Sequence, residues 1–169
     1  MRFTLVQAIL GMVIGLVVMI GISGCAFKPV KTLEFGYINK DRYRILLAAE
    51  ASAFKDTLAT NIACALKNRA YIKMVDVNEV SNESSENYHV IILINTCVAF
   101  HIDRQVSDYL EKITRKDNVI LITTAGDADW NAKISDVDAI TSASTMDKVD
   151  PLTDHILDKI DQLLKKTTL

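Results

Sequence analysis

Residues 89–94 read HVIILI, an unbroken apolar run with the length of one β-strand. Residues 44–49 (RILLAA) and 118–124 (NVILITT) have the same character, 71–77 (YIKMVDV) alternates as a strand does, and 137–141 adds a fifth strand. Strands that are apolar throughout are typical of a parallel sheet buried on both faces. HVIILI is the most apolar of the five, so we expect it near the centre of that sheet.

Amphipathic helices are predicted between these strands. The stripe of the first helix recurs every four residues and consists of Phe54, Leu58, Ile62 and Leu66, with Ser52 as its N-cap. Asp103 can cap a second helix, and Asp150 followed by Pro151 predicts the start of the last one. Residues 78–87 (NEVSNESSEN) are polar and barely long enough for a parallel connection, so we expect a degenerate or missing helix there.

This alternation predicts an α/β fold with three layers, in which helices cover both faces of a parallel five-stranded sheet. Five strands in a domain of this length fit the doubly wound order 2-1-3-4-5. The predicted domain covers residues 43–169. Ligands of such sheets bind at the carboxyl ends of the strands, which directs the search for a site to the loops that follow them.

The composition narrows the function classes. The chain has 169 residues, of which 50% are hydrophobic, and 19 Lys and Arg stand against 21 Asp and Glu. An apolar content this high excludes intrinsic disorder, and the lack of a clustered basic excess argues against nucleic-acid binding. His89, His101 and His155 have no ligand-like spacing with one another or with cysteine, so no metal site is predicted.

The N-terminus has the pattern of an export signal, a basic start at Arg2 followed by a long apolar run that ends at residues 22–25, ISGC. This ending resembles the bacterial lipobox, whose cysteine receives diacylglycerol after the preceding segment is removed. The resemblance implies a signal peptide at 1–24, a lipidated Cys25 and a tether at 25–42. It places the chain in the bacterial cell envelope, lipid-anchored and facing the periplasm or the extracellular side. A retained transmembrane helix is the alternative, since about 20 apolar residues span a bilayer.

The order of elements from Arg44 to Leu164 resembles the flavodoxin-like fold. Flavodoxins hold the phosphate of FMN in a Ser/Thr-x-Thr-Gly-x-Thr loop at a helix N-terminus. The matching stretch is 52–57 (SAFKDT), in which phenylalanine and lysine replace the middle threonine and the glycine. The resemblance implies that Ser52, Lys55 and Thr57 would face that phosphate.

Three further residues follow from the same resemblance. Phe100 and Trp130 come after the third and fourth strands, where flavodoxins hold the isoalloxazine ring between aromatic residues. Residues 138–144 (DAITSAS) are similar to the signature at which a periplasmic flavin transferase attaches FMN, which would make Ser144 the acceptor. The alternatives are aromatic residues that only pack over the loops and a small-residue turn after a strand.

These observations support three hypotheses about function. The first is flavin-linked electron transfer at a membrane surface, with FMN as cofactor and a redox partner. The second is a non-catalytic flavodoxin-like lipoprotein that binds a protein partner or a small ligand at the carboxyl ends of the strands. The third is a hydrolase or transferase with Ser52 or Ser144 as nucleophile, although no Gly-x-Ser-x-Gly elbow is present and no catalytic residue is assigned. A phosphotransfer receiver is excluded because the third strand ends in Asn95 where an aspartate is needed.

Overall fold

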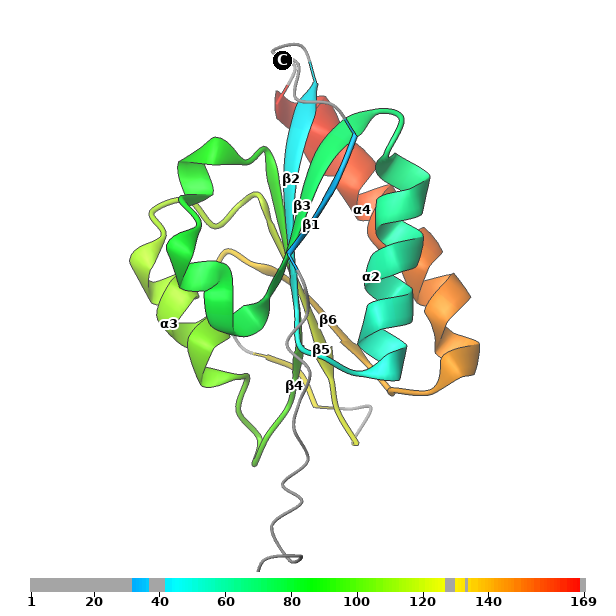
Figure 1. The fold of residues 1–169 in the computed structure, drawn as a ribbon. Helices are drawn as coiled ribbons and strands as arrows, with labels where there is room; N and C mark the ends of the chain where they lie inside the picture. The colour runs from blue at the N-terminus through cyan, green and yellow to red at the C-terminus, as the bar shows by residue number, and fades with distance from the viewer. Residues whose placement is uncertain (1–31, 37–41, 127–129, 133, 168–169) are drawn as a thin grey trace, which may run out of the picture.

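A computed structural model of the chain describes residues 32–36, 42–126, 130–132 and 134–167 (Figure 1). The described residues form a six-stranded sheet in the order β1-β3-β2-β4-β5-β6. Its strands are β1 Leu33–Phe35, β2 Tyr43–Ala49, β3 Ala70–Asp76, β4 Val90–Thr96, β5 Val119–Thr124 and β6 Asp138–Ser142. Adjacent strands from β3 to β6 are parallel, with β4 third among these five, as its apolar sequence predicts.

The sheet has one strand more than the sequence predicts. The parallel strands β3-β2-β4-β5-β6 reproduce the expected doubly wound order, but β1 adds an antiparallel strand at the edge, so the five-stranded prediction is wrong in its strand count. Strand β1 lies within the stretch expected as a tether, and its Leu33 and Phe35 pair with Met74 and Ile72. It covers backbone groups that an edge at β3 would otherwise expose.

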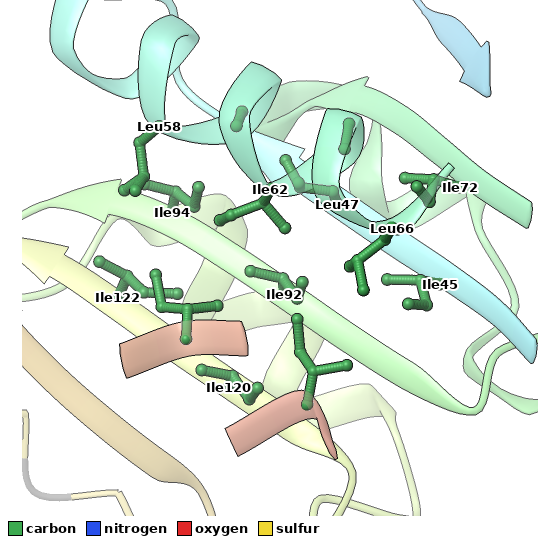
Figure 2. Packing of buried hydrophobic residues seen from close by; sticks show 14 of the residues in the cluster. Ile45, Leu47, Leu58, Ile62, Leu66, Ile72, Ile92, Ile94, Ile120 and Ile122 are labelled. Atoms are coloured by element: carbon green, nitrogen blue, oxygen red, sulfur yellow. The ribbon is translucent and has the colours of Figure 1, made fainter. Parts of the chain in front are cut away.

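Helices cover the two faces of the sheet. Helices α2 (Ala53–Leu66) and α4 (Val149–Thr167) lie on one face, and α3 (Arg104–Lys112) lies on the other (Figure 1). Figure 2 shows the first face, where apolar side chains of α2 point toward the strands. The α2 side chains are Leu58, Ile62 and Leu66, and the strand side chains below them include Ile45, Leu47, Ile92 and Ile94.

The connection between β3 and β4 contains two short 3₁₀ helices, η1 (Val77–Asn82) and η2 (Ser85–Asn87), in place of a full helix. This confirms the expected degenerate crossover. The buried Val77 and Val80 pack into the core beneath α3, on the face that a longer helix would otherwise cover.

The predicted caps are confirmed for two helices. The Ser52 hydroxyl accepts from the Lys55 amide at 3.2 Å, and the Asp103 carboxylate accepts from the amides of Gln105 and Val106. The predicted cap at Asp150 is wrong, because α4 begins one residue earlier and continues directly from the 3₁₀ helix η3 (Met146–Lys148). The proline after Asp150 still lies in the first turn, where no intrahelical N–H is required.

Candidate functional site

The carboxyl ends of the parallel strands define one edge of the domain, which we call the carboxyl rim. It consists of the described residues that follow each strand, namely 50–52, 97–103, 125–126, 130 and 143–148. The polar ends of β2 and β4, the start of α2 and the loops after β4 and β6 meet here. All six residues that the sequence singles out for a flavin lie on this rim or in the first turns of α2.

A buried ion pair lies at the centre of the rim. The Lys55 ammonium bonds the carboxylate of Glu50 and the hydroxyl of Thr96, and the Lys55 and Glu50 side chains are 5% and 24% exposed. The Thr96 hydroxyl donates to Glu50 Oε2 at 2.5 Å, and the Thr96 amide donates to Glu50 Oε1 at 3.3 Å. This cluster joins the end of β2, the first turn of α2 and the end of β4.

The same contacts occupy the groups expected to hold a phosphate. The Lys55 ammonium is bonded to Glu50 and Thr96, and the Ser52 hydroxyl accepts from the backbone of the helix it caps. The Thr57 hydroxyl donates to the Ala53 carbonyl at 2.7 Å, within its own helix. A dianionic phosphate at this position would meet the Glu50 carboxylate and would have to compete with it for the one nearby ammonium. The residues present therefore do not fit the FMN phosphate.

A two-residue hairpin projects from the rim after β4. Val98 and His101 exchange two backbone hydrogen bonds, of 2.8 and 3.0 Å, across the turn residues Ala99 and Phe100. Both turn residues have positive φ, 50° and 65°, as a type I′ turn requires. This conformation favours glycine or asparagine and costs other residues roughly 1–2 kcal/mol each. The Phe100 side chain is 74% exposed, so the strained turn presents an aromatic ring to the outside.

The hairpin is fixed at both of its bases. The Cys97 amide donates to the Thr124 carbonyl of β5 at 2.8 Å, on the incoming side. On the outgoing side the Asp103 amide donates to the fully buried Asn95 Oδ1 at 3.1 Å. The Asn95 amide group in turn donates to the Ile122 carbonyl. These bonds hold residues 98–101 in one place relative to the sheet, and they explain how the turn conformation persists.

The remaining predicted flavin residues lie apart from this hairpin in the chain. Trp130 is half-buried, and Ser144 is exposed between β6 and η3. Within the described segments no hydrogen bond or ring contact joins Phe100, Trp130 and Ser144. They share the rim, but in the described residues no hydrogen bond or ring pair brings them together around one ligand.

Two features of the rim escape the sequence reasoning. The pairing of Lys55 with Glu50 beside the end of β4 does not follow from the sequence pattern. The left-handed pair Ala99 and Phe100 contains no glycine or asparagine and gives no turn signal. One signal was available, the polar Asn95 and Thr96 at the end of an otherwise apolar strand, which indicates that local partners satisfy them.

The two cysteines in the described residues are not part of the ion-pair cluster. Cys64 is exposed on α2 and Cys97 is half-buried, and both are free thiols. Across the residues whose positions are described, no group of three or more His, Cys, Asp or Glu could hold a metal ion. The same part of the chain contains no helix that is both long and apolar enough to span a membrane. The lipobox at 22–25 lies outside the described residues.

The topology is consistent with a flavodoxin-like fold, an α/β domain with a mostly parallel sheet. No protein-family model matches the chain, and no curated protein matches it. Among solved structures it is similar to an oxidoreductase from Corynebacterium diphtheriae, with 11% identity, 72% of this chain and 92% of that chain covered, and a TM-score of 0.45. It is also similar to general stress protein 14 from Treponema denticola in complex with FMN, with 10% identity, coverage of 72% and 99%, and a TM-score of 0.43. Likeness this distant supports no statement about the function of this chain.

The buried ion pair gives a first prediction. Lys55→Met leaves the Glu50 carboxylate without its cation and should lower the free energy of unfolding by about 2 kcal/mol, less than for a fully buried pair because Glu50 reaches solvent. Adding Glu50→Gln should restore most of that loss, since no buried charge then remains. The control is Arg115→Met, which removes an exposed pair with Asp117 and should change stability by less than about 0.5 kcal/mol. Chemical denaturation measures all three, and equal effects of Lys55→Met and Arg115→Met would contradict the analysis.

The strained hairpin gives a second prediction. Replacing Ala99 and Phe100 by Asn and Gly supplies the residues that a type I′ turn prefers. The free energy of unfolding should rise by roughly 1–2 kcal/mol, and the melting temperature by about 3–6 °C. The matched control is Val98→Ser, which removes a neighbouring exposed apolar side chain and relieves no positive φ. No gain in the free energy of unfolding of the double variant would contradict the strain assigned to this turn.

Proposed function

We propose that the chain is a lipid-anchored, flavodoxin-like binding module of the bacterial cell envelope, which engages its ligand or partner through the carboxyl rim and does not carry FMN in the phosphate loop. The observation that carries this proposal is the Phe100 hairpin, an exposed aromatic ring held on a strained and well-anchored turn. Residues kept in unfavourable backbone conformations cluster at functional sites, because the surrounding structure has to maintain them.

The ion pair of Lys55 and Glu50 supports the second part of the proposal, that FMN is not held in the phosphate loop. A phosphate loop offers free amides, hydroxyls and a cation to its ligand. In this chain Lys55 is buried and bonded to Glu50 and Thr96, so the position that would receive the phosphate is filled from within. Binding FMN there would require breaking a largely buried salt bridge, a cost of about 2 kcal/mol because Glu50 reaches solvent.

The exposed surface of the hairpin supports binding. Val98 and Phe100 are 64% and 74% exposed and lie two positions apart in the same hairpin. Large apolar side chains exposed together mark interaction sites more often than isolated ones do. The Ser52 hydroxyl, by contrast, is explained by its role as a helix cap, so nothing in the geometry favours it as a nucleophile.

Covalent flavin attachment is the second candidate function. Ser144 follows β6 on the rim and is exposed, as an acceptor of a flavin transferase has to be. A phosphodiester at Ser144 would remove the need for a phosphate loop. This candidate predicts a flavin that resists denaturation, which separates it from the leading proposal.

The test of the cofactor uses the full chain purified from membranes of its native host. We expect no flavin absorbance band, either in the purified protein or after added FMN has been removed by desalting, because Lys55 is not available to a phosphate. A band lost on denaturation would overturn the argument from the ion pair. A band that survives denaturation and disappears in Ser144→Ala would establish the covalent alternative, and Ser142→Ala is the matched control on the same strand end.

The test of the anchor uses metabolic labelling with a radioactive fatty acid. The chain should incorporate label into Cys25, and Cys25→Ser should abolish it while leaving the signal uncleaved. Cys64→Ser, which changes an exposed thiol elsewhere, is the matched control and should label normally. Membrane association without label at Cys25 would indicate a retained transmembrane helix.

A further inference from the structure

The direction of β1 determines where the chain enters the domain. Because β1 is antiparallel to β3, its first residue lies toward the carboxyl ends of the other strands. Leu33 pairs with Met74, two residues before the end of β3 at Asp76. The chain therefore enters β1 at the end of the sheet nearer to the carboxyl rim.

The length of the segment that precedes Leu33 limits how far the rim can lie from an anchor at Cys25. Leu33 follows Cys25 by eight positions in the sequence. Even fully extended, eight residues span only about 27 Å. At Met74 the entry point lies two residues from the carboxyl end of β3 and four residues, about 13 Å, from its amino end at Ala70. The carboxyl rim is therefore the end of the sheet nearer to the entry point, which favours it as the side that meets a membrane holding Cys25.

The exposed apolar side chains gather on the same side. Four large apolar residues are exposed in the described part of the chain, and they are Leu33, Val98, Phe100 and Met146. Val98 and Phe100 form the hairpin after β4, Met146 begins η3 after β6, and Leu33 is the entry point itself. The amino ends of the strands carry none of the four.

The charges beside the hairpin are balanced. The exposed Arg104 pairs with Asp108, and the Asp103 carboxylate is bonded to the first amides of α3. The hairpin therefore offers a lipid surface its exposed apolar area, which favours the boundary between headgroups and acyl chains. Met146 is less suited to insertion, because Asp147 follows it and a hydrogen bond from Thr145 lowers the pKa of that carboxyl, which therefore stays charged. The hairpin is the part of the rim fitted to enter the bilayer.

We propose that the hairpin of residues 98–101 docks on the bilayer that holds Cys25, with Phe100 inserted at the level of the lipid headgroups. This inference rests on the lipid anchor of the proposed function and names the partner of the same rim. The anchor confines the hairpin close to the surface at high effective concentration, so a small apolar contact is enough to orient the domain. In this orientation the rim faces the membrane and the amino ends of the strands face away.

The experiment places a single tryptophan at either end of the domain. The full chain carrying Trp130→Phe and Phe100→Trp is purified from membranes in detergent and reconstituted into phosphatidylcholine and phosphatidylglycerol vesicles with brominated acyl chains. The matched control carries Trp130→Phe and Asn87→Trp, which puts the reporter on the exposed η2 at the amino ends of the strands. Brominated chains quench only a tryptophan that lies in or against the bilayer.

We expect fluorescence at residue 100 to fall roughly twofold relative to vesicles without bromine, with little change at residue 87. Equal quenching at the two positions, or none at residue 100, would overturn the docking proposal while leaving the anchor intact. Shielding of residue 100 from an aqueous quencher without bromine quenching would also overturn it, because a protein partner would then cover the hairpin. Failure of the chain to remain in the vesicles would instead contradict the anchor, and with it both proposals.

Discussion

Burial of β4 on both faces is the constraint on which the rest of the domain depends. Its residues from Val90 to Asn95 are shielded from solvent, so both faces of the strand require cover. Ile92 and Ile94 pack under α2 and α4, while Ile91 and Leu93 pack under α3 and η1. A parallel neighbour on each side then pairs the backbone N–H and C=O groups of β4. Polar side chains are therefore confined to the ends of the strand.

The polar side chains at the carboxyl end of β4 are hydrogen-bonded within the domain. Asn95 and Thr96 end the apolar run, and each finds its partners within the domain. Thr96 is hydrogen-bonded to both Glu50 and Lys55. The Lys55 ammonium is therefore already paired at the position that corresponds to the phosphate loop of flavodoxins. Asn95 fixes the segment before α3, which supports the hairpin. One strand end thus both engages the Lys55 ammonium and supports the hairpin.

The parts of the fold that could be predicted are those that repeat. The apolar runs locate the five parallel strands to within one or two residues, and the caps at Ser52 and Asp103 mark two helix starts. Strand β1 could not be predicted, because three residues are too few to show a period and their pairing depends on a distant edge.

The candidate site was predicted less well than the fold. Its position on the rim follows from the topology, but the partner of Lys55 depends on which strand ends meet in space. The positive φ of Ala99 and Phe100 depends on tertiary support, and no residue type announces it. Both features are set by tertiary contacts and not by the conformational preferences of the residues themselves.

The antiparallel edge strand has a mechanical consequence. Strand β1 is the first element of the sheet along the chain. It begins at the end nearer the carboxyl rim and runs away from it. The hydrogen bonds of an antiparallel pair are perpendicular to the strands, so a force along the strand shears them together and does not open them one by one. Gly36 ends the strand in a left-handed turn, φ 81°, against the Ala70 carbonyl, where a side chain would not fit. A pull on the chain before Leu33 is therefore borne by the whole strand at once, and a connection only three residues long resists detachment more than its length would indicate.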